Sequence, residues 1–218
     1  MVIRQISFDH KGGWYHYRIH TLKTSELCKD RLFALRQYLE EMFKDCPHHY
    51  FQMGPRSSTL KFKLDSLDLK HVKNHDLCDW TSHGLEQNGD RYKTAHTKVQ
   101  VFMLEKDSNT IAVEIPLWLE PEEVEFYQSL FKTNDPLTGH IDLLRIEGDK
   151  IWVLDYKPKA RLEKFAATQV YFYALMLSKR IKVPLEKFRC GYFDDGDCYL
   201  FRPDECKIPK MKSLGDFS

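Results

Sequence analysis

Apolar and polar residues follow two different periods along the chain, and these periods predict where helices and strands lie. Apolar positions at helical spacing predict helices over residues 24–44, 85–104 and 161–179. Thr24 or Ser25 provides the N-cap of the first helix. The third helix is apolar on most of its circumference, which is typical of a helix buried against a sheet.

Runs rich in β-branched and apolar residues predict the strands. They cover residues 111–119, 138–147, 150–156, 189–193 and 198–201. The last two form a hairpin, residues 1–20 suit another hairpin around Gly12-Gly13, and Pro121 opens a short helix. Residues 46–82 show no assignable pattern. This order of elements predicts an α/β fold with a mixed central sheet flanked by helices.

The turn between residues 138–147 and 150–156 sets the register of the central hairpin. Gly148 suits the first central position of a type II′ turn. Counting back from that turn places Asp142 opposite Asp155, and paired side chains share a face with Cβ atoms about 4.5–5.5 Å apart. Lys157 lies on the same face because side chains alternate along a strand.

Two carboxylates directly opposite each other repel unless a positive charge lies between them. A hard divalent cation bound through oxygen, with Lys157 completing the charge balance, would remove this repulsion. Such an ion activates a bound water and neutralises charge on a scissile phosphate, while Lys157 orients the nucleophile. The alternative is an ordinary hairpin with solvated acids, because a lone Asp-x-Lys triplet has little specificity. The apolar remainder of both strands speaks for a buried site, but the hairpin alone leaves both interpretations open.

Several motifs occur in a fixed order around this hairpin. They are Gly89-x6-His96, then Glu114, then Gly139-x-Ile141-Asp142, Asp155-Tyr156-Lys157 and Gln169-x3-Tyr173. The ordered set resembles the RecB-like branch of the PD-(D/E)XK nucleases. The resemblance implies a restriction-endonuclease-like fold with a helical N-terminal elaboration, in a single domain over residues 1–218 whose catalytic core spans about 85–203.

The resemblance also assigns roles to individual residues. Asp142, Asp155, Lys157 and Glu114 would be catalytic, and His96 and the Tyr156 carbonyl would join both aspartates as ligands of Mg²⁺ or Mn²⁺. Gln169 and Tyr173, four apart on one helical face, would hold DNA or the geometry of the site. Phosphate contacts would come from Lys159, Arg161 and Lys164 at the helix start. The structural alternatives are helix packing for Gln169 and Tyr173, a satisfied surface histidine for His96 and an ordinary strand-edge acid for Glu114. The basic set could equally be solvated surface residues.

Some relatives in this branch hold an iron–sulfur cluster through one early cysteine and three closely spaced late ones. The chain has Cys28 in its first helix, but Cys190, Cys198 and Cys206 are evenly separated, so we expect no cluster. Cys46 and Cys78 complete the set, and free thiols are expected. A second metal candidate, His71-x3-His75-x2-Cys78 with His83, matches no standard zinc spacing, so solvated histidines are favoured.

Composition changes this picture little. The 218 residues carry a formal charge of +1, so a basic DNA-binding surface would have to be local. No apolar run approaches the ~20 residues of a membrane span, and residues 1–5 do not begin a secretory signal. We therefore expect a cytoplasmic protein without membrane contact.

The expected function is a DNA exonuclease in repair, recombination or defence. No helicase motif is present, so any motor in a repair or defence complex would be a separate partner. The alternatives are a non-catalytic nucleic-acid-binding adaptor that retains the fold, and a structure-specific or RNA-directed nuclease.

Overall fold

The computed structural model describes residues 2–11, 13–125 and 127–209. Within these residues, eight strands form one sheet in the order β1-β2-β4-β5-β6-β7-β8-β3. The strands are β1 (Ile3–His10), β2 (Gly13–His20), β3 (Lys70–Val72), β4 (Thr110–Leu119), β5 (Leu137–Glu147), β6 (Lys150–Tyr156), β7 (Phe188–Phe193) and β8 (Cys198–Phe201). All neighbours are antiparallel except β6 and β7, which are parallel. The predicted mixed α/β architecture is confirmed.

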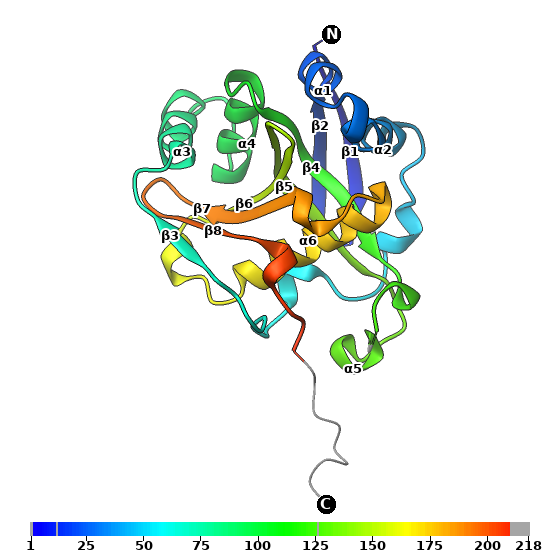
Figure 1. Ribbon diagram of the computed structural model, residues 1–218. Helices are drawn as coiled ribbons and strands as arrows, with labels where there is room; N and C mark the ends of the chain where they lie inside the picture. The colour runs from blue at the N-terminus through cyan, green and yellow to red at the C-terminus, as the bar shows by residue number, and fades with distance from the viewer. Residues whose placement is uncertain (1, 12, 126, 210–218) are drawn as a thin grey trace, which may run out of the picture.

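Helices cover both faces of the sheet (Figure 1). They are α1 (Thr21–Leu27), α2 (Phe33–Lys44), α3 (Asp76–Gln87), α4 (Ala95–Lys106), α5 (Tyr127–Phe131) and α6 (Ala166–Ile181). One hydrophobic cluster joins α2 and α6 to the sheet, and a second joins α3 and α4 to the other face. No helix among the described residues is long and apolar enough to cross a membrane.

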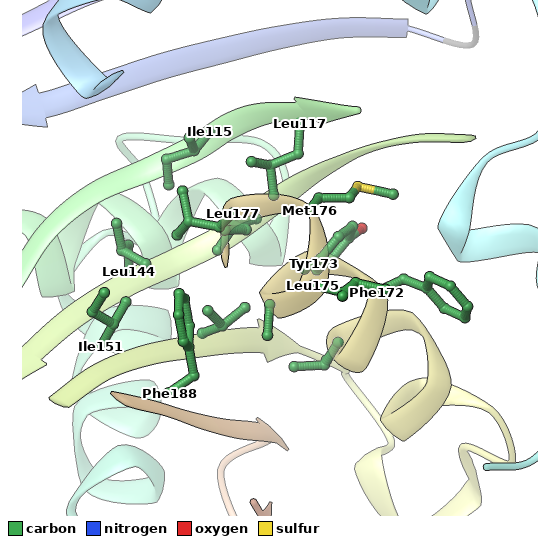
Figure 2. Packing of buried hydrophobic residues seen from close by; sticks show 14 of the residues in the cluster. Ile115, Leu117, Leu144, Ile151, Phe172, Tyr173, Leu175, Met176, Leu177 and Phe188 are labelled. Carbon is green, nitrogen blue, oxygen red and sulfur yellow. The ribbon is translucent and has the colours of Figure 1, made fainter. Parts of the chain in front are cut away.

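Helix α6 is the centre of the larger cluster. All but three of its residues are buried, in agreement with the apolar circumference in the sequence. Figure 2 shows Leu177 of α6 beside Ile115 of the sheet and Met176 beside Leu117, with Phe188 next to Ile151. Fully burying one such side chain contributes about 1.5–3 kcal/mol, so this packing fixes α6 against the sheet.

The first predicted helix is divided in two. Asp30 adopts a left-handed conformation with φ of +46°, which separates α1 from α2. The predicted N-cap at Thr24 or Ser25 is also wrong, because α1 begins at Thr21 and the His20 side chain accepts from Lys23 N–H. Apolar spacing continues across the break, so periodicity alone could not reveal it.

The predicted helix over residues 85–104 is likewise two helices. Helix α3 ends at Gln87, and α4 begins at Ala95, where Thr94 Oγ1 accepts from Thr97 N–H at 3.1 Å. Helix α3 and strand β3 both begin in residues 46–82, which carried no prediction. Helix α6 begins at Ala166 rather than at residue 161. The two terminal hairpins are present, although Gly12 of the predicted first turn lies outside the described residues.

A buried arginine connects the sheet to α3 and α4. Arg145 of β5 is 1% exposed, and its Nε lies 2.9 Å from Asp107 Oδ2. Its Nη2 lies 3.0 Å from Asp76 Oδ2 and 3.1 Å from Glu147 Oε1. Asp76 is at the start of α3 and Asp107 follows the end of α4. This network therefore sets where both helices lie on the sheet.

We expect Arg145→Met to lower the free energy of unfolding by about 3–5 kcal/mol, because it removes the ion-pair partner of the buried Asp107 carboxylate. Chemical denaturation followed by circular dichroism measures the loss. The double variant Arg145→Met/Asp107→Asn should recover part of it, since the uncompensated charge has gone. A loss below about 1 kcal/mol in the single variant would contradict the structural role of this network.

Candidate active site

The hairpin of β5 and β6 has the predicted register. Glu147 pairs with Lys150, and Gly148 has a φ of +58° as a type II′ turn requires. The ladder continues to Leu143 and Leu154 and then stops. At the next position the Tyr156 N–H donates to the carboxylate of Asp142 at 3.1 Å. A side chain has replaced the backbone acceptor here, so the strands separate where Asp142 and Asp155 stand opposite each other.

Strand β4 adds a third acid to the same row. Val113 pairs with Leu143 and Ile115 pairs with Ile141, which places Glu114 opposite Asp142. Glu114 has a φ of +56°, a left-handed conformation that costs a non-glycine residue about 1–3 kcal/mol. Its carboxylate accepts from Gln100 Nε2 of α4 at 2.7 Å. Strain of this kind within a strand points to a functional position.

Lys157 and Gln169 complete a network around Asp155. Lys157 Nζ lies 2.7 Å from Asp155 Oδ2 and donates to Gln169 Oε1 at 3.0 Å. Gln169 Nε2 lies 3.3 Å from Asp155 Oδ1 and donates to Tyr173 Oη at 2.8 Å. The structure thus brings four of the predicted residues, from β6 and α6, into one hydrogen-bonded group.

Gly139 explains why two of the sequence motifs occur together. A methyl group at Gly139 would overlap Tyr173 Cε1 and the Ser57 hydroxyl. Glycine therefore lets the Tyr173 ring lie directly against β5, which holds the Tyr173 hydroxyl at Gln169. The glycine before Asp142 is a packing requirement of α6 rather than a turn.

Asp142 and Asp155 are buried and Glu114 is partly buried, and the ionisation of Asp142 and Glu114 is suppressed. Burial raises the pKa of Asp142 well above its usual range, and the charges of Asp155 and Glu114 raise it further. Burial, assisted by Asp155, also raises the pKa of Glu114 to about 7. Burial alone would lower the pKa of Lys157, but Asp155 and Asp142 outweigh it and raise that pKa. Lys157 therefore stays protonated, in a site that holds more carboxylates than cationic groups.

This charge distribution fits a divalent cation. Asp155 Oδ2 is buried and makes no hydrogen bond, although Lys157 lies beside it. In the part of the chain that the structure describes, the site holds three carboxylates and only one lysine, and carboxylate oxygens are ligands that suit Mg²⁺ or Mn²⁺. Among the described residues, however, no three of these acids and His96 have ligand atoms that all lie within 4.8 Å of one another. Binding would thus require the carboxylates to turn toward the ion.

The other predicted ligands lie at the same end of the sheet. His96 is in the first turn of α4, and its Nε2 lies 3.8 Å from Asp142 Oδ2. Its ring also packs edge-on against the Tyr156 ring, with centroids 5.0 Å apart. Gly89, by contrast, lies in the turn between α3 and α4 rather than in a helix with His96.

The predicted phosphate-binding residues are exposed on the segment between β6 and α6. Lys159, Arg161 and Lys164 surround a 3₁₀ turn at Ala160–Leu162, so their predicted place at the helix start is wrong. The Ala160 N–H donates to Asp194 Oδ2 at 2.8 Å. That bond fixes the segment to the turn between β7 and β8, beside Lys157.

The histidines of the motif near α3 each contact a different group. His71 Nε2 lies 2.6 Å from Asp197 Oδ1, and the His75 side chain caps α3. His83 bonds to the Asp79 carbonyl one turn earlier. These side chains therefore have separate partners. Cys28, Cys190 and Cys198 are buried and Cys206 is partly buried, and the absence of an iron–sulfur cluster stays a prediction.

Gln100 and Ser57 belong to the site but were missed from sequence. Gln100 follows His96 by four residues on α4, so the two share a helical face. That spacing is a signal that could have been used. Ser57 lies in a segment without a pattern, and its hydroxyl donates to the Thr138 carbonyl at 3.1 Å. Only the folded chain reveals its place beside Tyr173.

Comparison with known proteins agrees with this geometry. The family model of the PD-(D/E)XK nuclease superfamily matches residues 68–213, about two thirds of the chain. That range includes every acid of the row, Lys157 and Gln169. No curated protein and no solved structure matches the chain.

The contact between Gly139 and Tyr173 is testable by a double-mutant cycle. Gly139→Ala should cost about 1–3 kcal/mol of stability because it forces the tyrosine ring out of place. In a Tyr173→Leu background the same change should cost less, since the overlapping ring atom is absent and only the overlap with the Ser57 hydroxyl remains. Gly196→Ala, at an open turn, is the control and should be neutral. Equal costs in both backgrounds would contradict the proposed contact.

The raised pKa of Glu114 predicts a pH-dependent stability. Its pKa rises from 4.5 unfolded to about 7 folded, so its contribution is full below pH 4.5 and is lost as the pH rises through 7. Without metal, Glu114→Gln should therefore be more stable than wild type at pH 8, by roughly 2 kcal/mol, and equal to it near pH 4.5.

Denaturation in EDTA across this pH range measures the difference. Gln100 can still donate to the amide oxygen of the variant, so its hydrogen bond is preserved. Glu122→Gln changes an exposed acid and should run parallel to wild type at all pH values. A Glu114→Gln profile that is also parallel to wild type would show that Glu114 ionises normally.

Proposed function

Because the chain belongs to the PD-(D/E)XK nuclease superfamily, we propose that it is a Mg²⁺- or Mn²⁺-dependent deoxyribonuclease of the RecB-like branch. The ordered motifs from His96 to Tyr173 support that branch. In this proposal residues 1–218 form one nuclease domain, whose catalytic core spans about 85–203. The protein would act as a cytoplasmic exonuclease in DNA repair, recombination or defence.

The observation that carries the proposal is the row of Glu114, Asp142 and Asp155 with Lys157 beside it. Nothing in the packing of the fold requires three acids on adjacent strands, and their burial destabilises the protein without a counter-ion. A binding module would gain nothing from this arrangement. Such a cost is expected where the acids serve a reaction.

The carboxylates of Asp142 and Asp155 would hold the ion, with His96 and the Tyr156 carbonyl at its other positions. When bound, the ion would supply Lewis-acid polarisation of the scissile phosphate and activation of water. Glu114 would remain next to Asp142, and the ion would offset the repulsion between the two carboxylates. Gln169 would keep Asp155 oriented through its amide, while Tyr173 keeps Gln169 oriented.

Lys157 would act as a donor rather than as a base. Its pKa is raised by Asp155 and Asp142, so it keeps its proton at neutral pH and cannot accept one from water. Nζ already reaches both Asp155 and Gln169. With the carboxylates neutralised, Nζ would be free to donate to the attacking oxygen or to a phosphate oxygen. Donation to charge that grows in the transition state is worth about 10²–10³ in rate.

DNA would reach the site over the segment between β6 and α6. Lys159, Arg161 and Lys164 are exposed there, so they could neutralise phosphates on either side of the scissile bond. The chain's balanced charge implies that this contact is local and sensitive to salt. Strand unwinding would be supplied by a separate helicase or by a repair or defence complex.

The decisive test is cleavage by Lys157→Ala and Asp155→Ala. Lys157→Ala should lower cleavage of linear DNA by about 10²-fold or more yet keep Mn²⁺ binding, because Lys157 is not a ligand. Asp155→Ala should lose both DNA cleavage and Mn²⁺ binding, because it removes a ligand oxygen. Lys150→Ala, at the far end of β6, is the matched control and should cleave like wild type.

Gel assays with linear and circular, single- and double-stranded DNA and with RNA, in Mn²⁺ or EDTA, report the activity. Calorimetry reports Mn²⁺ binding. A wild type that binds metal and DNA but cleaves no substrate would favour a non-catalytic adaptor. Cleavage of circles would exclude a strict exonuclease, and cleavage by Lys157→Ala at the wild-type rate would remove its proposed role.

A further inference from the structure

A second group of metal-ligating side chains lies apart from the acids, where β1 ends. His10 is the last residue of β1, and Cys46 and His48 follow α2. Among the described residues, these three form the one set of histidine, cysteine or acidic groups with ligand atoms all within 4.8 Å of one another. His10 Nε2 and His48 Nδ1 are 3.0 Å apart.

The local backbone brings these side chains together. The His48 N–H donates to the Cys46 carbonyl at 2.8 Å, which folds the chain tightly around Pro47. The Lys11 N–H donates to the Phe51 carbonyl at 3.1 Å, which ties the end of β1 to the same turn. The group is therefore built by two segments that are far apart in sequence and held by backbone bonds.

Aromatic rings shield the group from water on its inner side. The Phe51 ring stacks on His10 with centroids 4.1 Å apart, and His10 is 1% exposed. His48 is exposed on the outer side. Imidazole and thiolate are the ligands that Zn²⁺ prefers, and an apolar shell around a metal limits water access to it.

We propose that His10, Cys46 and His48 bind one Zn²⁺ ion, with a fourth position open to solvent at His48. The ion would connect the end of β1 to the segment after α2. This site is independent of the proposed nuclease centre, whose ligands come from other strands. Its role would be structural, because the three ligands come from two segments that the ion would tie together.

The hydrogen bonds around His10 define what binding must change. Arg56 can only donate, and its Nη2 lies 3.3 Å from His140 Nδ1. His140 then carries its hydrogen on Nε2 and donates to His10 Nδ1 at 2.9 Å. His10 in turn carries its hydrogen on Nε2, toward His48. That hydrogen stands where the metal would bind.

Zinc binding therefore replaces the hydrogen on His10 Nε2 and moves the hydrogen between His140 and His10. His10 gives up the Nε2 hydrogen and takes one on Nδ1 from His140, and His140 regains one on Nδ1 through solvent. The Cys46 thiol loses its proton to solvent, so one proton leaves in total. The cost is the contact between Arg56 and His140, because a hydrogen on Nδ1 would face the guanidinium and Arg56 would have to turn away; that contact is long for a hydrogen bond.

Cobalt(II) tests this site directly in the full-length, untagged protein. Co²⁺ bound to a thiolate gives an intense charge-transfer absorption in the near ultraviolet, and the acids and His96 at the nuclease centre offer no thiolate. We expect this band to reach its maximum at one equivalent of Co²⁺ and to disappear when Zn²⁺ is added. Cys46→Ser should abolish it, and His48→Ala should weaken Co²⁺ affinity by more than about tenfold.

Two variants control for the neighbouring chemistry. Cys206→Ser removes another accessible thiol, and His49→Ala removes the exposed histidine next to His48. Both should keep the band and the affinity of wild type. Asp155→Ala should keep the band as well, which separates this site from the nuclease centre.

The same proteins report the structural effect of the ion. Zn²⁺ should raise the melting temperature of wild type and of Asp155→Ala, but not of Cys46→Ser. A folded wild type with no thiolate band would overturn the proposal. So would a band that survives in Cys46→Ser, or one that Cys206→Ser removes.

Discussion

Repulsion between buried carboxylates is the constraint on which the rest of this structure depends. Glu114, Asp142 and Asp155 stand in one row across β4, β5 and β6, and burial suppresses the ionisation of the first two. Repulsion would push these carboxylates apart unless the surrounding residues held them in place. Three parts of the fold hold them: the sheet to which they belong, α6 on one face of the sheet and α4 on the other face.

Each of these supports is a specific contact. Gln169 of α6 holds both Lys157 and Asp155, and Gly139 lets α6 approach closely enough to do so. Gln100 of α4 holds Glu114 in its strained conformation. Arg145 fixes α4 through Asp107. The acids are thus kept apart by contacts that reach both faces of the sheet.

The central hairpin was predictable from sequence because its determinants are local. Gly148 fixes the turn, the turn fixes the register, and the register places Asp142 opposite Asp155. Motif order added His96, Glu114, Gln169 and Tyr173, and the family match covers all of them. The break near Asp30 was not predictable, because apolar spacing continues through it, whereas Asn88-Gly89-Asp90 and the N-cap residue Thr94 are local signals that could have divided the second helix.

Other features depend on contacts between distant segments. The positive φ of Glu114 follows from its place between two strands and α4, and no residue type at that position signals it. The overlap that excludes a side chain at Gly139 involves Ser57 and Tyr173, which lie 82 residues before and 34 residues after it. The meeting of His10 with His48 likewise needs the folded β1 and α2.

The outermost position of β3 has a consequence for synthesis on the ribosome. Among the described residues, β3 (Lys70–Val72) pairs only with β8, and its pair Lys70–Leu200 joins residues that are far apart in the sequence. While the nascent chain grows, β3 has no partner until β8 emerges, whereas the hairpin of β5 and β6 can close earlier. The acids can therefore come together before the sheet is complete. A three-residue strand offers little unpaired backbone for aggregation during that interval.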